Sequence, residues 1–229
     1  MQVNAIILAA GRGTRVGSRE PKVLLSVAGR PLILHTLERF RRSREVGKAV
    51  LVVPPDAVGD YEAMLAPVPE SSLEITVRPG GARRQDSVRA GLDALDLDCA
   101  VVLVHDGARP FAAPDLIDRC AREARAGRSV TVAVPARNTI KTVERGQVRE
   151  TLPRQSLWEI QTPQGFPLHL LRDAYAEAEQ EGVEATDDAM LVERLGVPVE
   201  VVEGSSTNLK VTYPEDLLYA EALVLNGVV

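Results

Sequence analysis

Short apolar runs alternate along the chain with segments whose hydrophobic residues recur at helical spacing. The apolar runs predict buried strands at residues 5–8, 49–53, 73–77, 100–104 and 130–134. The segments between them predict amphipathic helices at residues 32–40, 60–65, 86–95 and 115–126. This alternation predicts an α/β fold with a mostly parallel, doubly wound sheet that helices cover on both faces.

The pattern changes after residue 134. Short alternating segments at 139–151 surround Arg145-Gly146 and predict a β-hairpin. A lone hairpin is marginally stable in water, so we expect this one to pack against another surface, such as a second subunit. The pattern then predicts a helix at 168–181, a second helix from an N-cap at Thr186 to residue 195, and a strand at 199–202. The spacing of Thr212-Tyr213-Pro214-Glu215 is that of a capping box and predicts the start of the last helix. Without repeats or linkers, residues 1–229 are expected to form a single domain.

Composition excludes several classes of protein. The chain has 229 residues, of which 45% are hydrophobic and 26% charged, and its net charge of −5 argues against a general nucleic-acid binder. The two cysteines, Cys99 and Cys120, are too few for a disulfide framework or a four-cysteine zinc site. The first apolar run is too short and lacks the basic leader of a signal peptide, and none reaches the about 18 residues of a membrane span. We therefore expect a cytoplasmic protein that does not bind membranes.

The richest local signal is the loop that follows the first predicted strand. Its glycines let the backbone turn tightly and bring N–H groups close to an anion. Four cationic side chains accompany them, at Arg12, Arg15, Arg19 and Lys22. Guanidinium forks, an ammonium and backbone donors together suit a polyphosphate such as a nucleoside triphosphate.

Two better-known phosphate loops do not fit this segment. The P-loop needs a Gly-Lys-Ser or Gly-Lys-Thr ending, which the chain lacks. The dinucleotide fingerprint has Val16 at its third glycine position, and Pro21 opposes the helix that should follow. Pro21 instead favours an extended loop before Lys22, so a nicotinamide-dependent oxidoreductase remains only an alternative.

Two further segments follow predicted strands. The most apolar predicted strand ends in the segment His105-Asp106-Gly107-Ala108-Arg109-Pro110. Asp106 at this strand end is well placed to orient a metal or a substrate hydroxyl. An Asx-turn helped by Gly107 would also explain an aspartate at this position. His105 is given no role. Gly80-Gly81 leads into a helix and can present backbone groups to a base edge or an anion, although an ordinary strand–helix loop would look the same.

Taken together, these segments resemble one family. The opening loop, residues 105–110, Leu157-Trp158 before Gln161-Thr162-Pro163-Gln164, and Asn208-Leu209-Lys210-Val211-Thr212 are similar in order and spacing to the 2-C-methyl-D-erythritol 4-phosphate cytidylyltransferases of the non-mevalonate isoprenoid pathway. The resemblance covers essentially the whole chain. It implies a nucleotide-diphospho-sugar transferase fold with a protruding β-hairpin arm at 137–155, and a homodimer formed through that arm.

The resemblance also implies a reaction, in which the phosphate of methylerythritol phosphate attacks the α-phosphate of CTP in line and pyrophosphate leaves. Arg15 and Lys22 match the family's residues that stabilise the transition state, and Arg154 and Lys210 match those that position the acceptor. Positions around CTP are matched by Ala9, Ala10, Gly11, Gly13, Gly81 and Ser87. Substrate-side contacts are matched by Asp106, Arg109, Thr139 and Thr162. The arm residues Thr139 and Arg154 would reach the partner's site.

The expected chemistry agrees with the residues present. The attacking phosphate is already anionic, so no protein nucleophile is required, and the chain has no convincing Ser-His or Cys-His arrangement. Gathering many negative charges calls for fixed cations and Mg²⁺, held mainly by the CTP phosphates with Asp106 as the candidate protein ligand. Departures from the family pattern are Asn138, where Asp is common, and Gly107, where Ala is common. The alternatives are a ribitol-5-phosphate cytidylyltransferase, a sugar-1-phosphate nucleotidyltransferase and a nucleotide-binding module without catalysis.

Overall fold

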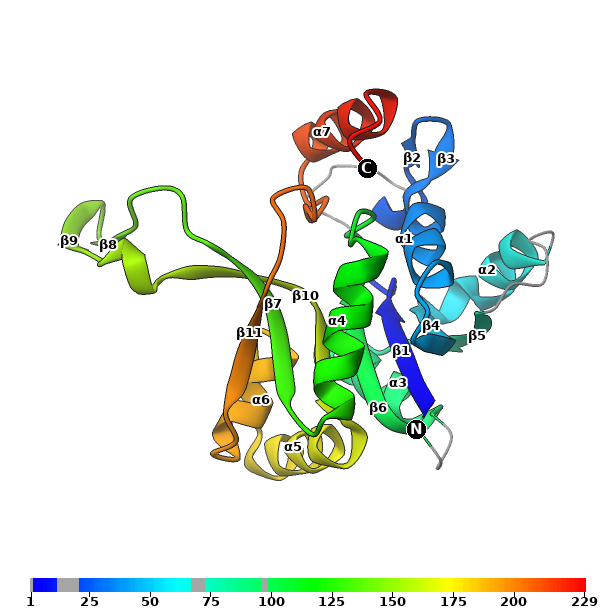
Figure 1. Ribbon diagram of the computed structural model, residues 1–229, viewed down its shortest axis with the longest axis horizontal. Helices are drawn as coiled ribbons and strands as arrows, with labels where there is room; N and C mark the ends of the chain where they lie inside the picture. The colour runs from blue at the N-terminus through cyan, green and yellow to red at the C-terminus, as the bar shows by residue number, and fades with distance from the viewer. Residues whose placement is uncertain (1, 12–20, 67–72, 96–98) are drawn as a thin grey trace.

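A seven-stranded sheet forms the centre of the protein, in the order β11-β7-β10-β6-β1-β4-β5. The computed structural model describes residues 2–11, 21–66, 73–95 and 99–229 (Figure 1). The strands are β1 (Gln2–Leu8), β4 (Val46–Val53), β5 (Glu74–Pro79), β6 (Cys99–Asp106), β7 (Ser129–Pro135), β10 (Trp158–Pro167) and β11 (Val199–Glu203). All neighbouring pairs are parallel except those of β10, which runs antiparallel to both β6 and β7. The predicted mostly parallel sheet is confirmed.

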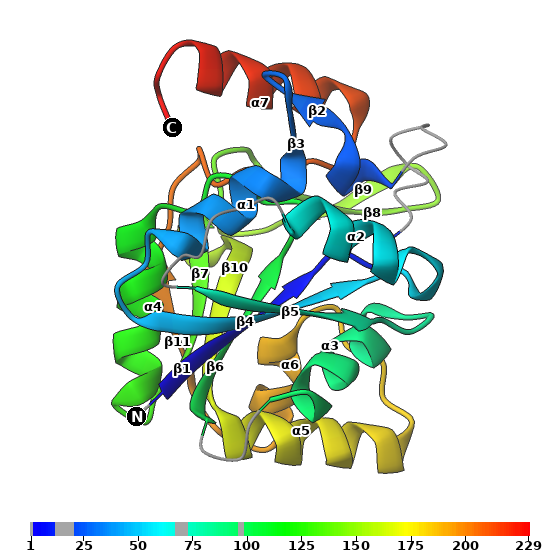
Figure 2. The ribbon, with the colours of Figure 1, turned by 90° about the vertical axis from the view of Figure 1, so that its right-hand side faces the viewer.

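Helices cover both faces of this sheet, as Figure 2 shows. One layer contains α1 (Leu32–Arg41), α2 (Val58–Leu65) and α4 (Pro114–Arg125), and the other contains α3 (Arg84–Asp93), α5 (Leu168–Glu181) and α6 (Asp188–Arg194). Each layer buries its apolar side chains in its own cluster: Leu37, Tyr61 and Ile117 belong to the first, Leu171 and Leu191 to the second. The doubly wound arrangement predicted from the apolar pattern is therefore confirmed.

The central position of β10 was not predicted. Its residues include Pro163 and the polar Gln161 and Gln164, which do not read as a buried strand. Gln164 is nevertheless fully buried, because its amide donates to Thr131 Oγ1 at 2.8 Å and its Oε1 accepts the backbone N–H of Asp188 at 3.1 Å. Hydrogen bonding to neighbouring elements thus compensates the burial of a polar strand.

Two predicted helix starts are wrong by one residue. The N-cap of α6 is Asp187, not Thr186, since the Asp187 carboxylate accepts the backbone N–H of Met190 at 3.0 Å. The last helix, α7 (Pro214–Leu225), does not use Glu215 for its capping box. Asp216 instead accepts the backbone N–H groups of residues 212 and 213, at 2.7 and 2.8 Å. In both cases the next carboxylate along the chain satisfies the free N–H groups.

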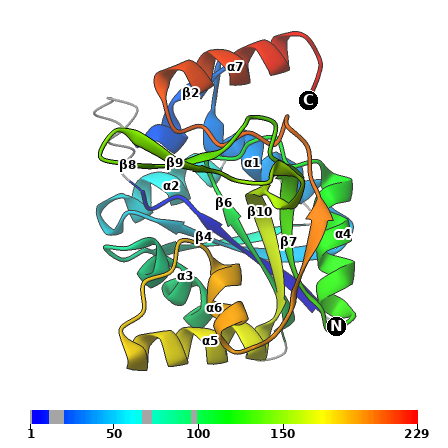
Figure 3. The same cartoon turned by 90° about the vertical axis from the view of Figure 1, so that its left-hand side faces the viewer.

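The remaining short elements lie near the carboxyl edge of the sheet. They are η2 (Lys22–Leu24), the antiparallel pair β2 (Ser26–Val27) and β3 (Arg30–Pro31), η3 (Pro55–Ala57) and η4 (Arg154–Ser156). At the opposite side of the sheet from β5, β11 forms an edge beside β7 (Figure 3). No helix within the described ranges has both the length and the apolar character needed to cross a membrane.

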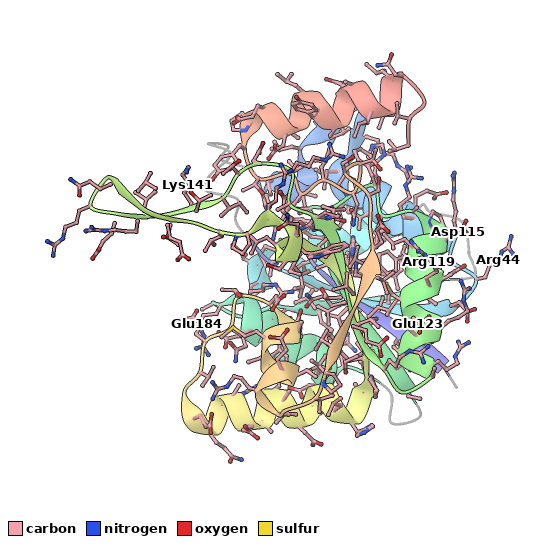
Figure 4. The ribbon with its side chains drawn as sticks, turned by 60° about the vertical axis from the view of Figure 1, so that its left-hand side comes forward. Arg44, Asp115, Arg119, Glu123, Lys141 and Glu184 are labelled. Atoms are coloured by element: carbon pink, nitrogen blue, oxygen red, sulfur yellow. The ribbon has the colours of Figure 1, made fainter. Side chains whose placement is uncertain are left out.

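A hairpin projects from the body of the molecule (Figure 1). Strands β8 (Lys141–Glu144) and β9 (Gln147–Thr151) pair antiparallel, and their turn residues Arg145 and Gly146 both have positive φ, as tight hairpin turns require. Figure 4 shows Lys141 on this hairpin, away from the sheet. The cross-strand partners Val143 and Val148 are 61% and 57% exposed, so the hairpin offers apolar side chains to solvent.

Candidate active site

A cavity of about 230 Å³ opens at the carboxyl edge of the sheet. Leu8 at the end of β1 pairs with Asp106 at the end of β6, so the segments that follow these two strands leave the sheet side by side. Parallel strands of doubly wound sheets present their ligands at this edge. The lining residues are Leu8, Ala9, Ala10, Gly11, Lys22, Val23, Gly81, Ala82, Arg83, Arg84, Ser87, Asp106, Ala108 and Lys210.

Close packing around Gly80 shapes one wall of the cavity. A Cβ on Gly80 would lie 2.6 Å from the Cβ of Ala10 and 2.8 Å from the Ser87 hydroxyl, so only glycine fits there. The next residue, Gly81, donates its backbone N–H to the Ser87 hydroxyl at 3.2 Å, and this hydroxyl in turn donates to the Arg83 carbonyl. The glycine pair therefore lets the turn before α3 pack tightly against the segment after β1.

Asp106 lies among three cationic groups. Its carboxylate is 2.7 Å from Lys210 Nζ, 3.6 Å from Arg84 Nε and 3.8 Å from Arg109 Nε, and its side chain is 12% exposed. Burial alone would raise the pKa of Asp106, but Lys210, Arg84 and Arg109 outweigh burial and hold that pKa well below its usual value. Asp106 is therefore ionised, and its side chain faces these cations rather than closing an Asx-turn.

A buried chain of hydrogen bonds fixes the backbone of Asp106. His105 is fully buried, which lowers the pKa of its imidazole to about 4, so the ring is neutral. Its Nε2 is 3.1 Å from the Arg109 carbonyl, which can only accept, so Nε2 carries the proton and Nδ1 accepts from Thr162 Oγ1 at 3.0 Å. Thr162 Oγ1 then accepts the backbone N–H of Asp106 at 3.0 Å. The Thr162 hydroxyl is thus engaged within the protein.

The Arg109 guanidinium also makes contacts within the protein. It donates to the Asn208 carbonyl at 2.8 Å and to the Ile160 carbonyl at 3.3 Å. The Asn208 amide donates to Gln161 Oε1 and to the Thr162 carbonyl, at 3.0 and 2.9 Å. Arg109 therefore connects β10 to the segment that carries Lys210, behind Asp106.

Two lysines from distant parts of the chain meet at the cavity. Lys22 begins η2, and its Nζ donates to the Val211 carbonyl at 3.0 Å, directly beside Lys210. Arg83 and Arg84 add two guanidinium groups to the lining. Of the described residues that line the cavity, Asp106 alone carries a carboxylate. The surplus of positive charge suits an anionic ligand.

The structure brings together most of the predicted site residues that it describes. Eight of them line the cavity: Ala9, Ala10, Gly11, Lys22, Gly81, Ser87, Asp106 and Lys210. Arg109 and Thr162 lie directly behind Asp106. Thr139 and Arg154 belong to the exposed arm and do not line the cavity, and Arg154 donates to the Arg137 carbonyl at 2.8 Å. Gly13 and Arg15 lie outside the described residues.

Sequence reasoning missed Arg84. The only signal for it was its place in the polar turn after a predicted strand, which an ordinary capped helix start explains equally well. It also missed Asp188, which pairs with Arg84 behind the cavity, and Tyr175, whose hydroxyl donates to Asp188. Neither of these residues lies in a motif whose spacing suggests chemistry.

The donor set of the cavity bears on metal binding. Within the described ranges, no cluster of three or more His, Cys, Asp or Glu side chains is arranged to hold a metal ion. Magnesium ions commonly bind through one or two carboxylates together with substrate phosphates. The ionised Asp106 fits a metal that arrives on phosphate groups and takes one oxygen from the protein.

A doubly wound sheet with a cationic cavity at its carboxyl edge is typical of α/β proteins that bind phosphorylated ligands such as nucleotides at that edge. The family model described as 2-C-methyl-D-erythritol 4-phosphate cytidylyltransferase matches residues 3–226. The chain belongs to this family, as the sequence motifs predicted.

Curated relatives and solved structures agree. The 2-C-methyl-D-erythritol 4-phosphate cytidylyltransferase of Bacillus velezensis is 45% identical over 98% of this chain and 96% of its own length. The enzyme of that name from Nostoc punctiforme is 43% identical over 96% of each chain. The crystal structure of 4-diphosphocytidyl-2C-methyl-D-erythritol synthase from Anaerococcus prevotii superposes with a TM-score of 0.86 at 30% identity, covering 98% of both chains. The cytidylyltransferase structure from Thermus thermophilus gives a TM-score of 0.80 at 38% identity, covering 98% of this chain and all of that one.

Proposed function

We propose that this protein transfers a cytidylyl group from CTP to 2-C-methyl-D-erythritol 4-phosphate, giving 4-diphosphocytidyl-2-C-methyl-D-erythritol and pyrophosphate in the non-mevalonate isoprenoid pathway. Family membership supports the reaction. The observation that carries the proposal for this chain is the convergence of Lys22, Lys210 and the ionised Asp106 on one cavity. Fixed cations of this kind stabilise the charge that develops during transfer at a phosphate.

The reaction needs positioning and charge stabilisation more than it needs a nucleophile. A phosphate oxygen of the acceptor attacks the α-phosphorus of CTP, the bond to the β-phosphate oxygen breaks, and pyrophosphate leaves with the electron pair. Lys22, together with Arg15, stabilises the extra charge on the α-phosphate. Lys210 and Arg154 hold the phosphate of the acceptor, since ammonium and guanidinium groups are the usual partners of phosphate oxygens.

The remaining predicted residues are assigned to binding. Ala9, Ala10, Gly11 and Gly13 present backbone N–H groups to the phosphates. Gly81 and Ser87 contact the cytosine through the turn that packs against the segment after β1. On the acceptor side, Asp106 contacts the substrate directly. Arg109 and Thr162 support it, since their polar groups already bind protein atoms.

Mg²⁺ enters this proposal as a partner of CTP. Bound to the triphosphate, it would neutralise charge and make pyrophosphate a better leaving group. Asp106 is the residue that would supply a protein oxygen, since it stays ionised beside its cations.

Residues 1–229 are proposed to form one domain, of which the arm at 137–155 is a part. This arm is proposed to form a homodimer and to place Thr139 and Arg154 in the cavity of the partner subunit. Its support is physical. An isolated two-stranded hairpin is marginally stable, and Val143 and Val148 expose apolar surface that a partner would cover. The expected compartment is the cytoplasm, which agrees with two buried cysteines, Cys99 and Cys120, that are not joined in a disulfide.

The test is pyrophosphate release from CTP and Mg²⁺ with either 2-C-methyl-D-erythritol 4-phosphate or ribitol 5-phosphate as the acceptor. Release with the first acceptor alone supports the proposal. Release with ribitol 5-phosphate alone would keep the transfer reaction and replace the substrate. If CTP binds but neither acceptor gives release, the protein is not the proposed enzyme.

A further inference from the structure

A buried network lies directly behind the cavity wall and is not part of the cavity. Its centre is Asp188, the first residue of α6, whose side chain is completely buried. Arg84 Nη1 and Nη2 donate to Asp188 Oδ1 and Oδ2 at 3.1 and 2.6 Å, which makes a two-pronged ion pair. The Tyr175 hydroxyl donates to Oδ1 of the same carboxylate at 2.5 Å.

This network controls the orientation of one cavity residue. A guanidinium is planar, so the ion pair with Asp188 fixes the plane and direction of the Arg84 head group. With Nη1 and Nη2 held by Asp188, the Nε edge of Arg84 faces Asp106 Oδ1 at 3.6 Å. Asp106 Oδ2 is then left to Lys210, at 2.7 Å. Arg84 therefore lies between a buried carboxylate and the carboxylate of the cavity.

The partners of Asp188 keep it in this position. Burial and the neighbouring Asp188 raise the pKa of Tyr175 far above its usual value, so its hydroxyl remains a hydrogen-bond donor. The backbone N–H groups of Asp188 and Ala189 both donate to Gln164 Oε1, at 3.1 and 3.2 Å. The side chain and the backbone of Asp188 are thus each held by more than one bond.

We propose that Asp188 and Tyr175 are positioning residues for the transfer reaction, acting through Arg84 on Asp106 and thereby on Lys210. Without the Asp188 charge, Arg84 is free to turn both Nη groups toward Asp106 and form the two-pronged pair there. Lys210 would then lose its place on Oδ2. Since Lys210 is assigned to the acceptor phosphate, the effect falls on the acceptor more than on CTP. This assignment rests on the proposed function.

The kinetic test compares Asp188→Asn with Asp173→Asn. Both replace a carboxylate by an amide, but Asp173 is exposed on α5. We expect Asp188→Asn to lower kcat/KM for the acceptor by about 10- to 100-fold, the usual loss for a supporting residue behind a site, while KM for CTP changes little. Asp173→Asn should behave as the wild type. Equal kcat/KM values for the two variants would overturn the proposal.

A second readout does not depend on catalysis. The chain has four lysines, at positions 22, 48, 141 and 210, so selective ¹³Cε labelling gives four resolvable signals. Asp188→Asn should move the Lys210 signal and leave those of Lys48 and Lys141 unchanged. An unmoved Lys210 signal would overturn the proposed route even if activity falls. A moved signal in a protein whose wild type transfers no cytidylyl group would support the positioning and reject only the proposed function.

Tyr175→Phe serves where Asp188→Asn fails to fold. It removes one hydroxyl and keeps the ring, which packs in the second apolar cluster, and it leaves the Arg84–Asp188 pair in place. We expect a smaller change in the same direction, in both kcat/KM for the acceptor and the Lys210 signal. A double variant with Arg84→Gln should lose no more activity than the worse single variant, because both changes act on one interaction. Additive losses would contradict the proposal.

Discussion

Replacing Asp106 by Asn tests the charge arrangement of the cavity directly. The amide has the shape of the carboxylate but no charge, so Lys210, Arg84 and Arg109 would face one another without their shared counter-ion. The backbone contact to Thr162 uses the N–H of residue 106 and survives the change. The variant therefore isolates the contribution of one negative charge.

The distances set the magnitude. At an effective dielectric constant of about 20, a unit charge pair interacts by about 6 kcal/mol at 2.7 Å and by about 5 kcal/mol at 3.6 Å, before desolvation is subtracted. Removing one partner from a buried pair costs about 3–5 kcal/mol in total. Here Lys210 is 37% exposed and can turn to solvent, and Arg84 keeps Asp188. Mainly Arg109 loses its counter-ion, so we expect about 3 kcal/mol.

The assay is urea unfolding at neutral pH, with and without pyrophosphate. Pyrophosphate supplies the missing negative charge, so it should stabilise Asp106→Asn more than it stabilises the wild type. The exposed Asp173→Asn, on α5, is the matched control and should unfold like the wild type. An unfolding free energy within about 1 kcal/mol of the wild type, or equal stabilisation of both proteins by pyrophosphate, would refute the reasoning.

The same variant predicts a pH dependence. The pKa of Asp106 is lower in the folded protein than its ordinary value of 3.8, so below that value the unfolded chain binds more protons. The stability that this carboxylate provides is therefore present above pH 3.8 and is lost as the pH falls below it. The difference in unfolding free energy between the wild type and Asp106→Asn should shrink over that acidic range.

Three further changes test separate features. Lys22→Ala should lower kcat by about 10²- to 10³-fold in the pyrophosphate assay while the protein folds normally, and near-normal turnover would reject its role. Gly80→Ala should lower the free energy of unfolding in urea by about 2 kcal/mol, because the new Cβ would lie 2.6 Å from the Cβ of Ala10. The control Gly47→Ala should lower it far less, because no atom lies within 4 Å of the Cβ that it adds. His105→Gln should flatten the pH dependence of stability between pH 6.5 and 4. In the wild type, the unfolded chain protonates this imidazole near pH 6.5 but the folded protein only near pH 4, so the free energy of unfolding falls by about 3 kcal/mol across that window. A variant with the wild-type slope there would show that His105 is not held neutral.

The sequence predicted most of the sheet because parallel strands buried on both faces are continuous apolar runs. The runs at 49–53 and 100–104 lie within β4 and β6, and the helical spacing at 115–126 corresponds to α4. β10 does not follow this rule. The burial of its Gln164 is compensated by hydrogen bonds to β7 and to the start of α6, and a single sequence does not reveal such partners.

The site was predictable to the extent that its chemistry is local in sequence. Glycine turns and clustered cations after strands indicated the cavity, because the carboxyl ends of parallel strands share one edge. Arg84 and Asp188 are 104 residues apart, and each follows a residue of its own type at an ordinary helix start. Their pairing depends on how α3 and α6 pack on the same face of the sheet, which no local pattern encodes.

The one strand of the seven-stranded sheet that the sequence did not predict is also the strand that positions the site. Because β10 runs antiparallel between β6 and β7, its polar side chains reach segments that leave the sheet in different directions. Gln164 holds the start of α6, where Asp188 orients Arg84, and Gln161 binds Asn208, two residues before Lys210. Between them, Thr162 holds the backbone of Asp106. A shift of β10 by one residue would turn these side chains to the other face of the sheet and break their hydrogen bonds. The polar residues that made this strand hard to predict from hydrophobicity therefore also fix its register.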